Sequence, residues 1–187
     1  CYLLDLNPLA DYCDKPDAEA ALLDDIRKTG QFTYFREKNE LAGVQFHCAA
    51  PPTLGSATVA TLTDGVIEGV VSDQLSAGWQ LNPATTEQTL TLECDLPEQP
   101  EANYFSIRLG GLEQRYMAQL VKLFIDDRLV LEKPLRANNG SNQFRLPETV
   151  KAGKLRIELL KNDVSPDNDR LYIGEIRLLK AGKPDTE

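Results

Sequence analysis

Hydrophobic and polar residues alternate along much of the chain from residue 53 onward. In three segments every second residue is apolar and the residues between are polar or charged: 90–96, 105–109 and 155–159. A period of two places one row of side chains in a core and the other row in water, as in a half-buried β-strand. Prolines and glycines separate these segments at turn-like positions. The pattern predicts an all-β fold, an antiparallel jelly-roll-type β-sandwich, over residues 53–187.

The segment 112–125 has apolar residues at helical spacing, so it fits a helix as well as a strand. We favour a strand because the apolar run 123–125 leads directly into Asp126 and Asp127, and a second apolar run, 129–131, follows. Two short apolar runs around turn-forming acids are typical of a tight hairpin.

The first 52 residues differ from the rest. Residues 14–30 predict one helix, with an acidic residue that can cap its start and a glycine at its end. Two strand-like pieces, 31–36 and 44–48, follow, and two prolines then break the chain. We place a boundary after Pro52 and expect an N-terminal extension packed on the main domain, or the tail of an upstream domain.

The net charge of the chain limits the classes of partner that it can bind. Over 187 residues the net charge is −9, which argues against nucleic acid or an anionic membrane as the main partner. No apolar run approaches the roughly 18 to 20 residues of a membrane-spanning helix. Residues 103–187 hold 15 basic and 12 acidic side chains. This surplus leaves room for a local anion-binding patch, although an ordinary solvated surface explains it as well.

The four cysteines do not follow a metal-binding or redox motif. The spacing of Cys13, Cys48 and Cys94 matches neither a zinc knuckle nor a CxxC pair. Cys94 alternates in phase with Leu92, so we expect a buried thiol there. Cys13 and Cys48 are the pair to test for a disulfide, and four reduced thiols are the alternative. Because the chain begins at Cys1 without a methionine, we expect it to be cut from a longer protein.

Several short motifs follow one another in a particular order. They are Thr63-Asp64-Gly65, then Ser76-Ala77-Gly78-Trp79, the strand 90–96, the hairpin 125–130 and the acid-containing segment 171–178. In this order they resemble the galactose-binding-like β-sandwich superfamily, which includes discoidin (coagulation factor 5/8 type C) domains and many carbohydrate-binding modules. The likeness covers roughly residues 55–180.

This resemblance implies a non-catalytic carbohydrate-binding module of a larger protein, which binds glycan through loops at one end of the sandwich. Three loops are rich in hydrogen-bonding groups: 110–116, 136–142 and 162–170. Loops held on a rigid scaffold commonly carry function. The competing interpretation of any one loop is that its Asn, Asp, Gly and Ser residues simply make turns.

Six residues are candidates for ligand binding: Arg115, Tyr116, Asn138, Asn139, Asn142 and, as an outer candidate, Arg145. Arg115 would hold a carboxylate or a vicinal diol, and Tyr116 would stack on a sugar ring. The asparagine amides would donate to and accept from sugar hydroxyls at once. Alternate loops of a sandwich emerge at the same end, so we expect these residues to converge. Trp79 is expected in the core rather than in the site.

The resemblance also implies a structural Ca²⁺ bound by an acid of the closing strand, and Glu175 stands at the matching position. A buried glutamate paired with an arginine explains this acid equally well, so no cofactor is certain. Asp163, Asp167 and Asp169 crowd one loop, and their oxygens suit Ca²⁺. They do not form an EF-hand, because the glycine and the final acid that such a loop needs are missing.

The sequence offers no catalytic centre. The single histidine, His47, directly precedes Cys48, and adjacent side chains of a strand point to opposite faces, so the two cannot form a catalytic pair there. No phosphate-binding loop, nucleophile elbow or HExxH motif occurs. Nothing singles out a pair of carboxylates of the kind that a glycosidase needs. We therefore predict that the chain is not an enzyme, although it can be an accessory domain of one.

Two hypotheses follow. The first is a module that binds glycan and is fused to or docked on another domain. Under this hypothesis the protein is secreted or at the cell surface rather than cytoplasmic. The alternative is a structural or protein-interaction β-sandwich domain that docks a partner or a catalytic domain. The extension and the stretch 51–102, which has no Lys or Arg, motivate the alternative. It predicts an exposed apolar patch.

Overall fold

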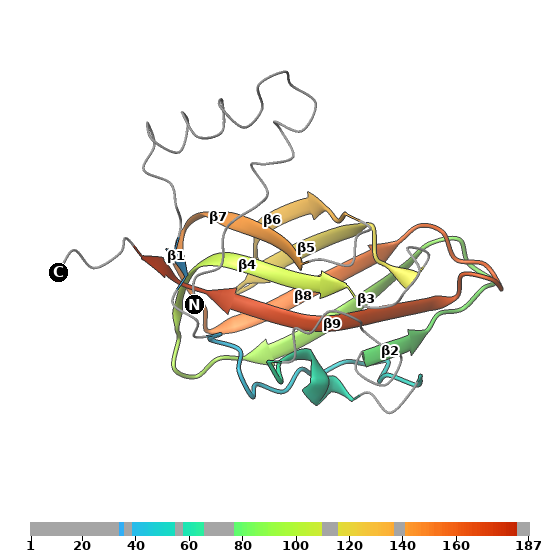
Figure 1. Ribbon diagram of the computed structural model, residues 1–187, viewed down its shortest axis with the longest axis horizontal. Helices are drawn as coiled ribbons and strands as arrows, with labels where there is room; N and C mark the ends of the chain where they lie inside the picture. Colours follow the sequence, from blue (N-terminus) through green and yellow to red (C-terminus); the bar gives the residue numbers. More distant parts are fainter. Residues whose placement is uncertain are drawn as a thin grey trace, which may run out of the picture.

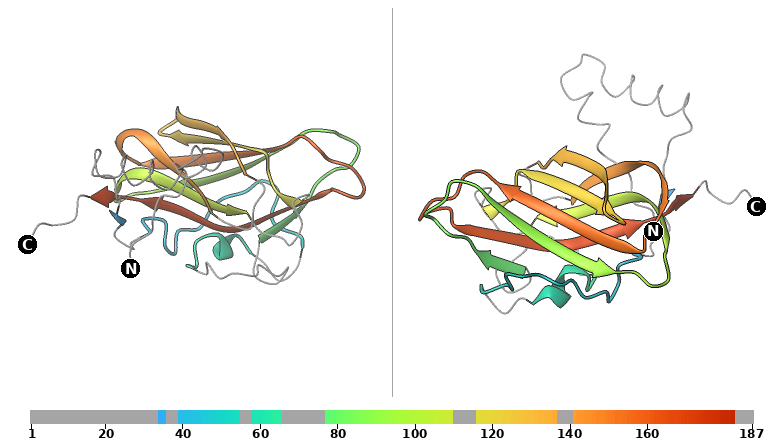
Figure 2. Two further views of the ribbon diagram at one scale, coloured as in Figure 1. Left: turned by 45° about the horizontal axis from the view of Figure 1, so that its top comes forward. Right: turned by 180° about the vertical axis from the view of Figure 1, so that it is seen from behind.

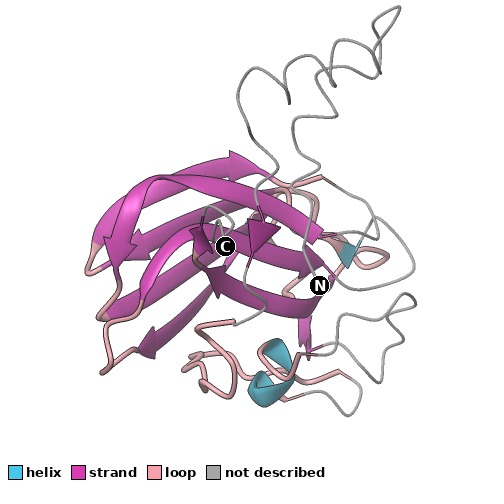
Figure 3. Ribbon diagram, turned by 60° about the vertical axis from the view of Figure 1, so that its left-hand side comes forward, coloured by secondary structure: helices cyan, strands magenta, loops and turns pink. Residues whose placement is uncertain are grey.

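The computed structural model describes residues 34–35, 39–54, 58–65, 77–109, 116–136 and 141–182. The helix predicted over 14–30 lies outside these residues, as does Cys13. Strands make up most of the described chain, which also contains a short 3-10 helix, η2 (Val59–Leu62) (Figure 3). The prediction of an all-β fold is therefore confirmed.

Two four-stranded antiparallel sheets pack face to face (Figures 1 and 2). The strand order in the first sheet is β2-β9-β4-β7, with bounds Ala77–Gln80, Arg170–Leu179, Glu101–Leu109 and Ser141–Lys151. The order in the second sheet is β3-β8-β5-β6, with bounds Gln88–Asp95, Lys154–Lys161, Leu120–Ile125 and Arg128–Pro134. A two-stranded ribbon joins β1 (Tyr34–Phe35) to β10 (Ala181–Gly182).

Side-chain alternation explains how the two sheets make one core. In β8 the residues Leu155, Ile157 and Leu159 are fully buried, and the residues between them are only partly buried. In β3 the buried row includes Leu92 and Cys94, as the sequence predicted. Burial, and to a lesser extent the neighbouring charge of Asp95, raises the pKa of the Cys94 thiol to about 12, so this thiol stays neutral.

The predicted hairpin is formed by β5 and β6, so strand rather than helix is confirmed over 120–125. Asp126 and Asp127 have φ of 48° and 63°, in the left-handed region that a two-residue hairpin turn with type I′ geometry requires. Asp126 Oδ1 also accepts hydrogen bonds from the backbone N–H groups of Gly153 (3.2 Å) and Lys154 (2.8 Å). The hairpin tip is thereby tied to the turn between β7 and β8.

The segment 39–54 is part of the sandwich. It runs along the lower side of the sandwich in Figure 1 and contributes Leu41 and Phe46 to the core. The strand expected over 44–48 reduces to one bridge, in which the backbones of His47 and Glu93 exchange hydrogen bonds of 2.6 and 2.9 Å. The proposed boundary after Pro52 stays a prediction.

Trp79 lies in the core, as expected. It is 1% exposed, and its indole Nε1 donates a hydrogen bond to the carbonyl of Ala50 at 2.5 Å. Cys48, beside this contact, carries a free thiol whose Sγ donates to the same carbonyl at 3.0 Å. The disulfide suggested between Cys13 and Cys48 is therefore not formed in the structure, because Cys48 is a free thiol.

Candidate functional site

The topology gathers four loops at one end of the sandwich, which we call the loop end. They connect β2 to β3 (81–87), β4 to β5 (110–119), β6 to β7 (135–140) and β8 to β9 (162–169). The first and last of these lie side by side at the right of Figure 1. Leu81 N donates to Asp169 O (2.5 Å), and Leu135 N donates to Gln119 O (2.8 Å). Asn162 N donates to Gln119 Oε1 (3.0 Å), so hydrogen bonds between their described residues link the four connections.

The residues selected from the sequence fall in different places. Arg115, Asn138 and Asn139 lie outside the described residues. Tyr116 is at the loop end, half-buried, where its ring packs edge-on against Tyr172 with centroids 5.4 Å apart and planes at 80°. This contact is of the favourable aromatic kind and fixes the orientation of the Tyr116 ring.

Asn142 and Arg145 lie on β7. Asn142 is buried, and its amide accepts from the backbone N–H of Arg136 (2.8 Å) and donates to the carbonyl of the same residue (3.3 Å). This pair of bonds closes the base of the loop between β6 and β7. Arg145 is exposed within β7, opposite Tyr104 of β4, and so lies on the sheet rather than in a loop. The ligand contacts expected of both residues stay predictions.

Arg170, which we did not select from the sequence, stands at the loop end as the first residue of β9, opposite Gln80 of β2. Its side chain is 44% exposed and lies 3.9 Å from the carboxylate of Asp169. A side-chain hydrogen bond with Tyr172 raises the pKa of the Arg170 guanidinium above its ordinary value, and the nearby Tyr116 acts in the same direction. Gln80 Nε2 donates in turn to Asp169 Oδ2.

Tyr116, Arg170, Asp169 and Gln80 therefore place a ring, a cation, a carboxylate and an amide within one small region. A guanidinium group donates in a forked geometry, a carboxylate accepts, and an amide does both. Adjacent sugar hydroxyls need donors and acceptors at this kind of spacing, and an aromatic ring can cover the apolar face of a sugar. The chemistry of the cluster suits a neutral polyhydroxylated ligand.

Glu175 lies away from the loop end, in β9, and is 2% exposed. Burial raises the pKa of its carboxyl group to about 7, although the backbone N–H of Gly65 (3.3 Å to Oε2) lowers it. The charge of Asp64 raises this pKa further, and Asn39 Nδ2 donates to Oε1 at 3.4 Å.

The carboxylates of Glu175 and Asp64 are ligands of the kind that Ca²⁺ prefers. Over the residues that the structure describes, however, no three His, Cys, Asp or Glu side chains gather into a metal-binding group. A Ca²⁺ at Glu175 would therefore take its remaining ligands from backbone carbonyls or other neutral oxygens. The calcium site stays a prediction.

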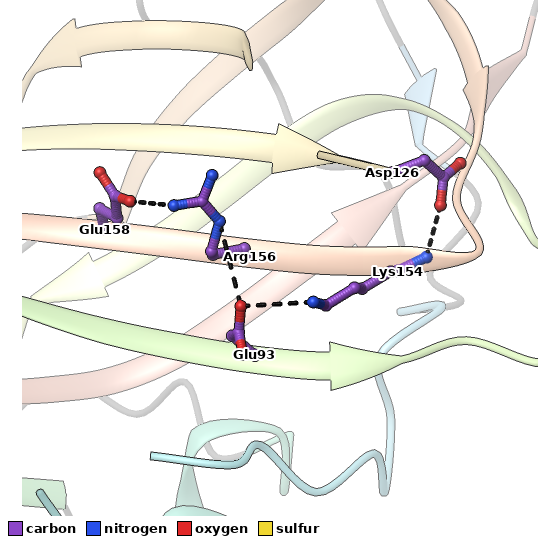
Figure 4. Close-up of polar contacts among 5 residues, drawn as sticks. All are labelled: Glu93, Asp126, Lys154, Arg156 and Glu158. Carbon is purple, nitrogen blue, oxygen red and sulfur yellow. Dashed lines mark hydrogen bonds and ion pairs between the residues drawn. The ribbon is translucent and has the colours of Figure 1, made fainter. Parts of the chain in front are cut away.

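Basic side chains on the outer face of the second sheet are held in cross-strand ion pairs (Figure 4). Glu93 Oε1 lies 3.5 Å from Lys154 Nζ and 4.0 Å from Arg156 Nε, and Arg156 also pairs with Glu158. The Arg156 guanidinium group covers the Phe124 ring at 3.7 Å. These residues make an ordinary charge-balanced surface rather than an anion-binding patch, and each exposed pair adds little stability.

The described surface shows no large exposed apolar patch of the kind that the docking hypothesis predicts. Within the described ranges, Leu129 is the one large hydrophobic residue that is exposed. His47 is exposed, and the Cys48 thiol donates to a backbone carbonyl rather than to an imidazole. No helix of the described chain is long and apolar enough to cross a membrane.

Comparison with protein-family models and with curated protein sequences finds no match. Solved structures do match. The family 32 carbohydrate-binding module of Streptococcus pneumoniae EndoD aligns with 76% of this chain and 99% of its own, with TM-score 0.59 and 14% identity. The lectin domain of Lectinolysin, in complex with Lewis b antigen, aligns with 79% of this chain and 99% of its own (TM-score 0.57, 14% identity).

The family 32 module of C. perfringens NanJ, in complex with galactose, aligns with 74% of this chain and 94% of its own, with TM-score 0.53 and 12% identity. The likeness at such low identity concerns the fold. The chain shares the β-sandwich fold of these carbohydrate-binding modules, which is the fold that the resemblance of its motif order implied.

Proposed function

We propose that this chain is a non-catalytic carbohydrate-binding module of a larger protein, and that it binds glycan at the loop end. The observation that carries the proposal is the cluster of Tyr116, Asp169, Arg170 and Gln80, which joins an aromatic ring to complementary hydrogen-bonding groups. The predicted contacts Arg115, Asn138 and Asn139 belong to the segments that connect β4 to β5 and β6 to β7.

Arg170 is the central contact in this proposal. Its guanidinium group is partly exposed, and the hydrogen bond with Tyr172 holds it in place before a ligand arrives. A preorganised donor loses less conformational freedom on binding. Because Asp169 stands beside it, the pair offers a donor and an acceptor to neighbouring hydroxyl groups rather than a bare cation to an anion.

The solved structures with the same fold support neutral sugars as the ligand class. Among them are complexes with galactose and with Lewis b, both of which are uncharged and rich in hydroxyl groups. A cluster that is open on the surface favours modest affinity. We expect a Kd on the order of micromolar to millimolar, or about −4 to −8 kcal/mol.

The test is calorimetric titration of the chain with galactose and with Lewis b tetrasaccharide, followed by Arg170→Ala. Loss of charge-assisted hydrogen bonds from Arg170 should cost roughly 1.5 to 3 kcal/mol of binding free energy. Arg128→Ala is the matched control, because Arg128 is exposed, pairs with Glu148 at 2.8 Å and lies at the other end of the sandwich.

Equal affinities of wild type, Arg170→Ala and Arg128→Ala would remove Arg170 from the site. Absence of binding to both sugars and to a broad glycan array at millimolar protein would contradict the function itself. Circular dichroism of each variant checks that the sheets remain folded.

A further inference from the structure

Lys161 breaks the pattern of the strand that carries it. In β8 the residues Leu155, Ile157 and Leu159 alternate into the core, and Lys161 is next in the same phase. It is 1% exposed, among the largest fully buried side chains of the described chain. Burying an ammonium group is costly unless it is well hydrogen-bonded, so a lysine at a core position needs a reason beyond packing.

The contacts of Lys161 lead to the loop end. Its Nζ donates to Asn168 Oδ1 at 2.6 Å and to the backbone carbonyl of Arg170 at 2.7 Å. These are short, charge-assisted hydrogen bonds. The two acceptors stand on either side of Asp169, and Asn168 is itself buried. One buried cation thus fixes the chain immediately before and after a residue of the proposed site.

Other contacts complete the support of this loop. The carbonyl of Asp169 accepts from Leu81 N at 2.5 Å, and Asn168 N closes a turn on Ser165 O at 2.8 Å. The side chain of Arg170, in contrast, is 44% exposed, while its backbone carbonyl accepts the hydrogen bond from Lys161. Rigid backbone under an exposed side chain is what preorganised binding requires.

We propose that Lys161 is a positioning residue of the glycan-binding site: its buried ammonium group fixes Asn168 and the Arg170 carbonyl so that the Arg170 guanidinium is held ready for ligand. This inference rests on the proposed function of the loop end. Stability alone does not account for the lysine, because apolar residues that replace a buried charged group together with its polar partners are often neutral or stabilising.

The decisive variant is Lys161→Met, which keeps the length of the side chain and removes the charge and the donors. We expect a loss of thermal stability, because Asn168 Oδ1 and the Arg170 carbonyl lose the donor that Lys161 supplies. We also expect amide hydrogen exchange of residues 162–170 to be faster, and galactose affinity to be about tenfold weaker, which corresponds to about 1.4 kcal/mol. Lys154→Met is the matched control, since Lys154 lies in the same strand at the opposite end and is partly exposed.

Asn168→Ala removes one acceptor and tests the same contact if Lys161→Met does not fold. The losses of galactose affinity from the two substitutions should not add, because both break the same contact. The double variant should therefore bind galactose about as well as whichever single variant binds it more weakly. Unchanged exchange in 162–170 and unchanged affinity in both variants would overturn the proposal. Faster exchange spread evenly over β3, β5 and β8 would also overturn it, because the role would then be purely structural.

The outcomes separate this proposal from the proposed function. If wild type binds no glycan, the function fails, while the exchange of residues 162–170 in Lys161→Met still decides whether Lys161 orders this loop. If wild type binds galactose and Lys161→Met binds it equally well with the same loop exchange, the function stands and the positioning role falls.

Discussion

The ring of Tyr172 lies directly against the backbone of Gly78 on the neighbouring strand. A Cβ atom added at Gly78 would be 2.7 Å from Tyr172 Cε1 and 2.8 Å from Leu54 Cβ, closer than real side chains approach. Tyr172 in turn packs against Tyr116 and hydrogen-bonds with Arg170. The absence of a side chain at Gly78 therefore lets Tyr172 take the place from which it contacts Tyr116 and Arg170 of the proposed site.

Gly78→Ala is expected to displace Tyr172. Overpacking of this kind typically costs about 1 to 3 kcal/mol of unfolding free energy, and galactose affinity should fall with it. Gly174→Ala is the control in the same sheet, because its Cβ would meet Arg108 Cδ at 3.5 Å, an ordinary contact. Urea denaturation of both variants gives the comparison. Equal unfolding free energies of the two variants would show that Tyr172 can move aside without destabilising the fold.

The hairpin tip should be improved by glycine. Asp127 has φ of 63°, a left-handed conformation that glycine adopts without the steric cost that other residues bear. We expect Asp127→Gly to raise the free energy of unfolding by up to about 1 kcal/mol. Asp126→Gly should not do so, because Asp126 Oδ1 accepts two backbone hydrogen bonds that the substitution removes. Thermal denaturation of the two variants should therefore shift in opposite directions.

The stability of the chain should depend on the protonation of Glu175. Burial raises the pKa of this carboxyl group from 4.5 to about 7 in the folded state, so the folded chain binds this proton more tightly than the unfolded chain. The contribution of Glu175 to the unfolding free energy should therefore be greatest below pH 4.5 and fall as the pH rises to about 7. Glu175→Gln cannot titrate, so the difference between wild type and variant in EDTA isolates this slope. A difference that is constant with pH would contradict the raised pKa.

A calcium site at Glu175 would reverse that pattern. Bound Ca²⁺ holds the carboxylate ionised, and a ligand at a hundred times its Kd stabilises the folded state by about 2.7 kcal/mol. We expect Ca²⁺ to raise the melting temperature of wild type and of Asp163→Asn, but not of Glu175→Gln. Equal calcium responses of wild type and Glu175→Gln would place any calcium elsewhere.

The sequence predicted the strands better than the site. Period-two alternation follows directly from burying one face of each strand, so β3, β4 and β8 were visible in the sequence, while β5 was inferred from the hairpin turn that follows it. The prediction of a strand over 44–48 was misleading. The apolar residues of this segment pack against the core, but the segment pairs with a sheet only through one bridge at His47. Whether short apolar runs pair into strands depends on distant partners, which local patterns do not contain.

The site depends on pairing across the chain. Arg170 meets Gln80 only because β2 pairs with β9 in one register, and the sequence separation of 90 residues hides this relationship. Asn142 had the right residue type for sugar contact, yet the structure places its amide on the backbone of Arg136. Lys161 did leave a signal, since it continues the buried phase of its strand, but a lysine at the end of a strand is usually solvated.

The most direct test of glycan binding at the loop end is an NMR titration of the isotope-labelled chain with galactose. We predict that amide shifts change at Gln80, Tyr116, Asp169 and Arg170, while those of Asp126 and Gly153 at the opposite end stay constant. Shifts that gather at the opposite end or on the outer face of the second sheet would contradict glycan binding at the loop end. So would a titration in which neither galactose nor Lewis b tetrasaccharide moves any amide of the loop end.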